Sequence, residues 1–343
     1  MAIQGIGINA HAERIDGDME VLASDLAHFQ RAGFDYAEIP VHGVDAILNG
    51  RLNLRQMKRI KEVLSRFDLR YTVHCSNWLN LMEADEFALH RSIFEASIDF
   101  ASEINAQILV YHAGRAELGD EYLGPAAFTH DLLSLPDQVI VQECERRERE
   151  TLAELADLAG EKGVTICVEN ADPRVDESAI WEMARRVRVK GVDLFYSIAP
   201  GGDVAIYNYG GVVERLVRQI EGVGKENVGI TLDFGHAYIA SQYYGFDFLS
   251  STELAGPLIK HVHVHDNFRR AAGVDRRQIV LIAQGKGDLH MPVGWGEIPY
   301  REVFRRLKGY NGVIMLELKP RYMAYLGEAL EEVSRLLREC GVD

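Results

Sequence analysis

The chain has 343 residues, a length that fits one large domain or two modest ones. Hydrophobic residues make up 47% and charged residues 26%, which is an ordinary globular composition and excludes a disordered or fibrous chain. With 37 basic and 52 acidic residues, the formal net charge is -15. A surface this acidic repels phosphate backbones and anionic lipids, so we do not expect nucleic acid to be a partner.

Eight short apolar runs alternate with amphipathic stretches along the chain. We expect strands at 3–8, 36–41, 70–73, 106–111, 164–168, 228–232, 259–264 and 312–316. We expect helices at 19–31, 54–66, 86–103, 148–162, 212–222, 300–307 and 324–340. Strands that are apolar almost throughout indicate a parallel sheet covered on both faces, and eight such strands alternating with helices predict a (β/α)8 TIM barrel.

Domain organisation and location follow from what the chain lacks. No Pro/Gly/Ser-rich linker interrupts it, so residues 1–343 are expected to form a single domain. An open doubly wound sheet is the alternative, but no GxGxxG turn follows the first strand. The four cysteines form no CxxC pair, and neither a signal peptide nor a membrane span is recognisable. We expect a cytoplasmic protein with no membrane contact, and self-association into a homo-oligomer is left open.

Three segments are longer than ordinary loops and predict extensions at the carboxyl ends of the strands. They are 114–147, 171–211 and 266–298. In α/β barrels the loops at this end carry the chemistry, so we expect these segments to cover a pocket.

Six predicted strands carry a histidine or a carboxylate at or just beyond their carboxyl ends. In chain order these residues are His74, His112, Glu169, Asp233, His263 and Glu317. A parallel barrel brings such residues to one face, where buried imidazoles and carboxylates need a cation among them. His236 follows Asp233 closely enough to face the same ion, and Asp288 and His290 form an Asp-x-His pair in the loop after the seventh strand. The mixture of oxygen and nitrogen ligands favours Mn²⁺, Zn²⁺, Co²⁺ or Fe²⁺ over Mg²⁺ or Ca²⁺.

Other polar residues near the strand ends are weaker candidates. His261, His263 and His265 alternate, so they should face the same way at different depths, and we expect only one of them to reach the metal. Asp266 is expected to support the loop. Lys319, Arg321 and His236 are candidate substrate contacts. Lys319 and Arg321 could equally be solvated cations of a surface loop. His11 and His42 follow the first two strands and could line the pocket, although hydrogen-bonded loop positions are the more common role.

Taken together, these motifs identify a resemblance to the xylose-isomerase-like barrel superfamily, which holds sugar phosphate isomerases and epimerases together with endonuclease IV. The matching stretches are Val73-His74-Cys75, Val110-Tyr111-His112-Ala113-Gly114, Cys167-Val168-Glu169-Asn170, Thr231-Leu232-Asp233-Phe234-Gly235-His236, His263-Val264-His265-Asp266, Gly287-Asp288-Leu289-His290 and Leu316-Glu317. In the sugar branch, the resemblance implies one metal ion held by Glu169, Asp233, His263 and Glu317. Glu169 and Glu317 would then transfer protons through a metal-stabilised enediolate of a sugar, keto-sugar or polyol. We expect one Mn²⁺ or Zn²⁺ ion rather than three.

Two other activities remain open. In endonuclease IV three zinc ions are bound by nine residues, and a residue of matching type stands at each position here: His74, His112, Glu169, Asp233, His236, His263, Asp288, His290 and Glu317. Such a tri-zinc phosphodiesterase is opposed by the acidic charge, by the long segments, and by Asn77 in place of a DNA-contacting tyrosine. A metal-dependent lyase acting on a sugar derivative would use the same enediolate chemistry.

Overall fold

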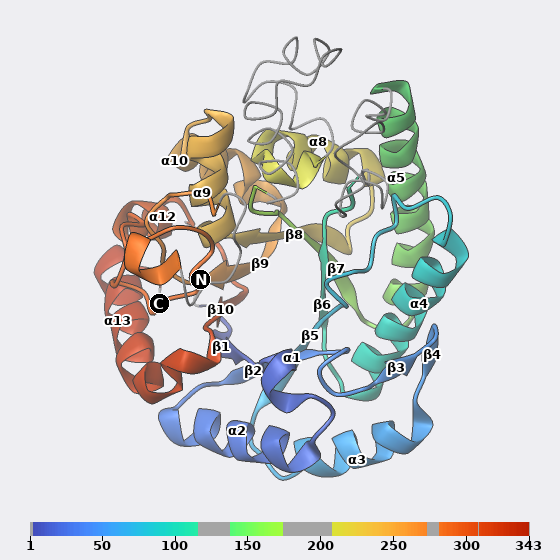
Figure 1. Cartoon of the computed structure of the whole chain (residues 1–343), viewed down its shortest axis with the longest axis horizontal. Helices are drawn as coiled ribbons and strands as arrows, with labels where there is room; N and C mark the ends of the chain where they lie inside the picture. Colours follow the sequence, from blue (N-terminus) through green and yellow to red (C-terminus); the bar gives the residue numbers. More distant parts are fainter. Residues whose placement is uncertain (1–2, 116–137, 174–207, 273–280, 308, 343) are drawn as a thin grey trace, which may run out of the picture.

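The computed structural model describes residues 3–115, 138–173, 208–272, 281–307 and 309–342. In these ranges eight parallel strands close into a barrel in the order β1-β10-β9-β8-β7-β6-β5-β2, with helices around it (Figure 1). The strands are β1 (Gly5–Asn9), β2 (Tyr36–Pro40), β5 (Arg70–His74), β6 (Ile108–His112), β7 (Thr165–Glu169), β8 (Val228–Asp233), β9 (Ile259–Val264) and β10 (Val313–Leu316). The predicted (β/α)8 TIM barrel and its strands are confirmed.

Each predicted helical stretch is helical in the structure. The corresponding helices are α2 (Met19–Ala32), α3 (Leu54–Leu64), α4 (Phe87–Glu103), α5 (Gln138–Glu161), α8 (Val213–Val223), α12 (Tyr300–Arg306) and α13 (Leu326–Cys340). Helix α5 begins at Gln138, so the end of the 114–147 segment is helical rather than loop, because the apolar periodicity extends further back than predicted. The remainder of that segment and most of 171–211 lie outside the described residues, and their covering role stays a prediction.

Several elements were not predicted from the sequence. They are α1 (Ala12–Ile15), α9 (Phe234–Tyr244), α10 (Phe248–Ala255), a hairpin of β3 (Ile47–Leu48) and β4 (Arg51–Leu52), and the 3-10 helices η4 (Tyr209–Gly211), η5 (Gly256–Leu258), η6 (Ile282–Gln284) and η7 (Pro320–Tyr325). Helix α9 is buried on most sides and therefore lacks the polar stripe that reveals a surface helix. Within the described residues, no helix combines the length and the apolar character needed to cross a membrane.

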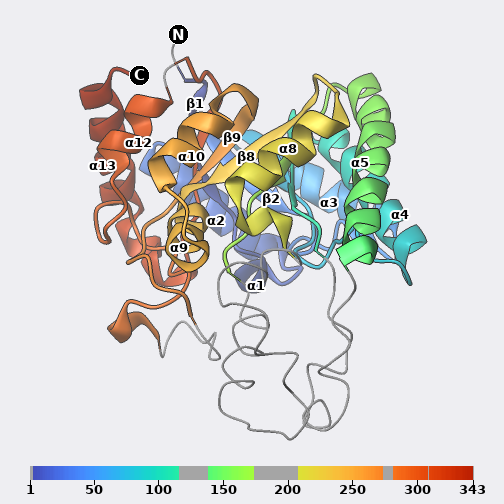
Figure 2. The same ribbon diagram turned by 90° about the horizontal axis from the view of Figure 1, so that it is seen from above.

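Alternation along the strands separates the barrel core into two layers. Outward residues such as Ile8 and Ile39 are buried against the surrounding helices. Inward residues at the amino-terminal ends of the strands form a separate apolar cluster of Tyr36, Val313 and Met315. Towards the carboxyl ends the inward positions become polar, and Figure 2 shows α1 at this end of the barrel. The candidate site therefore lies in the layer of inward-facing residues nearest the carboxyl ends of the strands.

Candidate metal centre

All nine predicted ligands meet in the inward layer towards the carboxyl ends of the strands, where three further residues, Glu38, His261 and His265, join them. Among the described residues, potential ligand atoms lie within 4.8 Å of one another in four groups. We name these the central group (Glu169, Asp233, His263, Glu317), the side group (His74, His112, Glu169), the outer group (His236, His265, Asp288, His290) and the deep group (Glu38, His261, His263). His236 and Asp233, which the sequence placed near one ion, therefore belong to different groups.

Glu169 connects the central and side groups. It is fully buried at the end of β7. One carboxylate oxygen, Oε2, lies 3.2 Å from His74 Nε2 and 3.0 Å from His112 Nε2, and the other lies 3.1 Å from His263 Nδ1. Burial opposes a charged carboxylate, but the imidazoles of His112 and His263 hold the pKa of Glu169 well below its usual range. Glu169 is thus an ionised carboxylate with both oxygens directed at nitrogen donors.

The other central carboxylates converge on His263 Nδ1. Asp233 caps helix α9, because its Oδ1 accepts a hydrogen bond of 2.7 Å from the His236 backbone N–H, and its Oδ2 lies 3.8 Å from His263 Nδ1. Glu317 Oε2 lies 3.4 Å from the same nitrogen. Ligands bonded to one ion at about 2.1 Å stand roughly 3.0–3.4 Å apart, so most of these separations suit a shared divalent cation.

Backbone carbonyls fix the orientation of three histidine rings. The Nδ1-to-oxygen distances are 2.8 Å from His74 to Cys75, 3.0 Å from His236 to Asn170 and 2.9 Å from His290 to Glu317. Since a carbonyl oxygen can only accept, each Nδ1 must carry a hydrogen, and each ring directs its Nε2 at a carboxylate. An Nε2 that faces carboxylate oxygens requires a proton or a metal cation between them, and this orientation is typical of metal-binding histidines. The donor set therefore fits a divalent metal.

The pKa of His74 leads to a prediction for the metal-free protein. Burial lowers this pKa, but the hydrogen bond and charge of Glu169 outweigh it and raise the pKa to about 9. Stabilisation by the imidazolium is complete below the unfolded value near 6.5 and is lost as the pH rises through about 9. We expect chelator-treated protein to lose on the order of 3 kcal/mol of unfolding free energy over this range. Urea unfolding of wild type and His74→Asn should show a shallower pH dependence in the variant, and equal slopes would contradict the assignment.

Glu38 is a site residue that the sequence analysis missed. It lies within β2 and is buried, with Oε1 3.0 Å from His263 Nε2 and Oε2 3.2 Å from His261 Nε2. The Thr72 hydroxyl donates a further hydrogen bond of 2.8 Å to Oε2. Burial raises the pKa of Glu38, but the charge of His263 and hydrogen bonds from both imidazoles lower it far more. A glutamate in the middle of an otherwise apolar strand was the available signal.

We expect Glu38→Gln to weaken metal binding by about 10–100-fold, the usual cost of losing a partner that orients a metal-binding histidine. Glu38 faces His263 Nε2, so it holds the ring with Nδ1 towards the central group. Competition with a chromogenic chelator measures the affinity. Asp25→Asn, which changes a buried carboxylate paired with Arg14 outside all four groups, is the control. Equal affinities in the two variants would contradict this role.

The three alternating histidines are distributed over three of the four groups. Each of them belongs to a group of potential ligands, so the expectation that only one of them reaches the metal stays a prediction. His263 belongs to the central and deep groups, His265 to the outer group and His261 to the deep group. Because the three histidines alternate along the chain, their rings lie on the same side at successive depths in the barrel. A carboxylate lies close to each of these rings.

Asp266 supports the following loop, as predicted. Its side chain accepts backbone hydrogen bonds of 3.0 Å from Asn267, 2.9 Å from Gly294 and 3.1 Å from Ile298. Burial raises its pKa, and the backbone hydrogen bonds partly offset this effect. The loop that carries Asp288 and His290 is consequently tied to the end of β9.

A cavity of about 370 Å³ opens beside the central group. Its walls include His11, His42, Asn77, Trp78, Glu317 and Lys319, so His11 and His42 do line the pocket. Burial and nearby Lys319 lower the pKa of His11 to about 4, which keeps this ring neutral near pH 7. Glu169, His236 and Arg321 are not among the lining residues, and Arg321 is exposed beside the Tyr322 ring. Their roles towards a substrate stay predictions.

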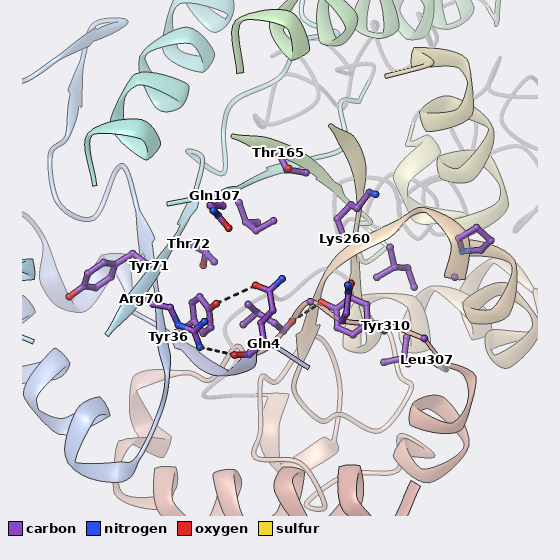
Figure 3. A pocket seen from close by; sticks show the side chains of 18 of the residues that line it. Gln4, Tyr36, Arg70, Tyr71, Thr72, Gln107, Thr165, Lys260, Leu307 and Tyr310 are labelled. Carbon is purple, nitrogen blue, oxygen red and sulfur yellow. Dashed lines mark hydrogen bonds between the residues drawn. The ribbon is translucent and has the colours of Figure 1, made fainter. Parts of the chain in front are cut away.

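A larger cavity of about 930 Å³ lies at the opposite end of the barrel (Figure 3). Gln4, Tyr36, Arg70 and Lys260 are among its lining residues, and the Arg70 guanidinium donates a hydrogen bond of 2.6 Å to the Gln4 carbonyl. No residue of the four ligand groups lines this cavity. Thr72, whose hydroxyl donates a hydrogen bond to Glu38, is among its lining residues. Because this end of a TIM barrel generally serves stability, we place the candidate site at the carboxyl ends.

The fold agrees with comparisons to known proteins. Residues 26–340 match the xylose isomerase-like TIM barrel family, and the chain belongs to this family. An uncharacterised protein of Methanocaldococcus jannaschii, MJ1311, is 25% identical over 306 residues, which are 88% of this chain and 80% of that protein.

Solved structures of similar fold include a D-tagatose 3-epimerase-like protein, with a TM-score of 0.65 and 22% identity over 98% of this chain and 99% of the other. A D-psicose 3-epimerase from Clostridium cellulolyticum H10, solved with D-tagatose, has a TM-score of 0.62 and 15% identity over 97% and 98% of the two chains. At these identities the similarity establishes the shared fold.

Proposed function

We propose that the protein is a metal-dependent isomerase or epimerase of a sugar, keto-sugar or related polyol. The observation that carries this proposal is the position of Glu317, which belongs to the central ligand group and also lines the cavity beside it. A carboxylate in that position can reach both a bound cation and a carbon of a small substrate. The fold shared with sugar 3-epimerases is consistent with this chemistry.

The cavity walls suit a small hydroxylated ligand. Lys319 and the neutral ring of His11 offer hydrogen bonds to hydroxyl groups, and Asn77 offers both a donor and an acceptor. Trp78 is 74% exposed and presents an apolar face to which the C–H side of a sugar can pack. We propose that these residues orient the substrate with its carbonyl towards the central group.

The proposed reaction is proton transfer at the carbon next to the carbonyl. A divalent ion, Mn²⁺ or Zn²⁺, would act as a Lewis acid at Glu169, Asp233, His263 and Glu317. Burial opposes ionisation of Glu317, but His290 and His263 lower its pKa well below the usual range, so it begins the reaction as a carboxylate able to accept the proton. Glu169 is the proposed second carboxylate, because β7 and β10 are separated around the barrel by β8 and β9.

Solvent exchange tests this proposal. Protein reconstituted with Mn²⁺ or Zn²⁺ and incubated in D₂O with a panel of keto-sugars should introduce deuterium beside the carbonyl, as measured by NMR. Chelator-treated protein should show no exchange. Absence of exchange across the panel would overturn the isomerase proposal. Cleaved products accompanying exchange would instead indicate the lyase.

A tri-zinc phosphodiesterase is the second candidate, and a specific observation favours it. The side and outer groups lie next to the central group, and Glu169 is common to the side and central groups. Three zinc ions per chain with hydrolysis of an abasic-site oligonucleotide would support this reading. A metal-loaded protein that exchanges sugar protons and leaves the oligonucleotide intact would exclude it.

A further inference from the structure

The cavity at the amino-terminal ends of the strands differs in charge from the rest of the molecule. Its walls carry the cations Arg70, Lys260 and Arg306. Glu253 is the one carboxylate among its described lining residues. The chain as a whole has 52 acidic and 37 basic residues, so this positive excess is local. Concave walls with an excess of one charge concentrate ions of the opposite sign, and this cavity therefore favours an anion.

A β-bulge turns Lys260 into this cavity. The pairing of β8 with β9 shifts by one residue at this point, so Lys260 is an extra residue of β9. Gly229 of β8 faces the barrel axis, because its neighbours Val228 and Ile230 belong to the hydrophobic core outside the barrel. A Cβ on Gly229 would lie 2.2 Å from Lys260 Cγ, so the lysine stem fills the space that a side chain there would occupy. The bulge and the glycine together direct Lys260 inwards.

Two of the cations have donor groups without a partner in the described part of the protein. Lys260 is exposed, and its ammonium group makes no hydrogen bond or ion pair with another described residue. Arg306 Nη1 donates a hydrogen bond of 3.0 Å to the Glu302 carbonyl of its own helix. Arg306 Nε, in contrast, is buried and has no hydrogen-bond partner within the described ranges. A buried N–H group needs an acceptor, and an anion in the cavity would supply one.

The third cation, Arg70, is held in a fixed orientation. Its guanidinium carbon lies 4.0 Å from the centroid of the Tyr36 ring, and one of its N–H groups donates to the Gln4 carbonyl. The Tyr36 hydroxyl donates a hydrogen bond of 3.3 Å to Gln4 Oε1, which ties the two neighbours together. A guanidinium has several further N–H donors, so Arg70 can bind an anion without first being ordered. Figure 3 shows Lys260 across the cavity from Arg70.

The size and charge of the cavity indicate the class of ligand. Its volume of about 930 Å³ is near the upper end of the range for small-molecule sites, about 300–1,000 Å³. Three cations and one carboxylate give the described walls a formal charge of +2. Thr165 and Gln107 also line the cavity and offer neutral hydrogen-bonding groups. A phosphate monoester carries about -1.5 to -2 charges near pH 7, and a dicarboxylate is also a dianion at this pH.

We propose that this cavity binds a small organic dianion, either a phosphate monoester or a dicarboxylate, through Arg70, Lys260 and Arg306. The bound dianion is an effector or a stabilising ligand rather than a second substrate, because no residue of the four ligand groups lines the cavity. It would connect the amino-terminal ends of β5 and β9, whose other ends carry His74 and His263. The proposal is independent of the reaction at the central group.

Calorimetric titration of the full, metal-loaded chain tests the proposal. At least one of glycerol 3-phosphate and succinate should bind, whereas uncharged glycerol should not. The tighter of the two dianions identifies phosphate or carboxylate as the preferred group. The bound dianion should also raise the melting temperature, because a ligand that binds only the folded state stabilises it. Absence of binding by both dianions, or binding of glycerol as tight as that of glycerol 3-phosphate, would overturn the proposal.

Three lysine variants locate the bound dianion. Lys260→Met keeps the stem but removes the charge, so affinity should fall by about 10–100-fold, the usual contribution of one charge-assisted hydrogen bond. Lys58→Met removes the same charge from an exposed position that lines neither cavity, and its affinity should stay within a few-fold of wild type. Lys319→Met changes the cavity beside the central group. Affinity lost in Lys319→Met but kept in Lys260→Met would place the dianion there and overturn the proposal.

A fourth variant should shift the affinity in the opposite direction. Glu253 is exposed on α10, so Glu253→Gln should fold normally. It removes the one carboxylate among the described lining residues and should tighten dianion binding by a few-fold. A misfolded protein cannot give this gain, and unchanged or weaker binding in Glu253→Gln would contradict the proposal. Because the readouts are binding heat and melting temperature, failure of the sugar reaction leaves this test intact.

Discussion

Glu317→Gln should reduce deuterium exchange into the substrate by about 10²–10⁴-fold, the usual contribution of a positioned acid–base group. The amide occupies the same volume beside the cavity but cannot accept the proton. Glu169, Asp233 and His263 remain in the central group, so some metal should stay bound. Exchange is measured by NMR on protein whose metal content has been determined by elemental analysis.

Glu13→Gln is the matched control for this variant. Glu13 also lines the cavity, but it belongs to none of the four ligand groups of the described residues. We expect its exchange rate to stay within a few-fold of wild type. Full exchange in Glu317→Gln would show that the two-carboxylate mechanism is wrong, and complete loss of metal would show that Glu317 acts only as a ligand.

Glu169→Gln should have the broadest effect, because this carboxylate is shared by two groups. His74, His112 and His263 all direct a nitrogen at its oxygens, and its side chain is fully buried. We expect loss of the metal from the central and side groups, with exchange falling to background. Removing one member of a buried ion network costs roughly 3–5 kcal/mol, so unfolding of the chelator-treated variant in urea near pH 6 should require less denaturant.

A second buried glutamate provides the comparison. Glu148 in α5 is also fully buried, but it accepts hydrogen bonds from Tyr111 and Gln219 rather than from imidazoles. Glu148→Gln should lose stability and keep its metal. A Glu169→Gln protein with wild-type metal content would contradict the role assigned to Glu169.

Periodicity made the barrel and most of the site predictable. Apolar runs marked the eight strands, and parallel strands in a closed barrel bring their carboxyl ends together whatever their distance in sequence. Residues at those ends, such as His74 and Glu317, could therefore be assigned to one face before any coordinates were known. Helix α9 was not predicted because it is buried on most sides. It therefore lacks the polar stripe by which an amphipathic helix is recognised in a sequence.

The sequence by itself determined the architecture and predicted nine candidate ligands, since both depend on local alternation and on where each strand ends. Only the tertiary structure decided how those ligands divide among groups, because the division depends on ring orientation and on distances between strands. Only the tertiary structure showed that Glu38 and His265 belong to these groups. Glu38 faces His263, and the His265 ring packs against Gly235. Partners of this kind lie far apart in sequence, and packing of the closed barrel brings them within bonding distance.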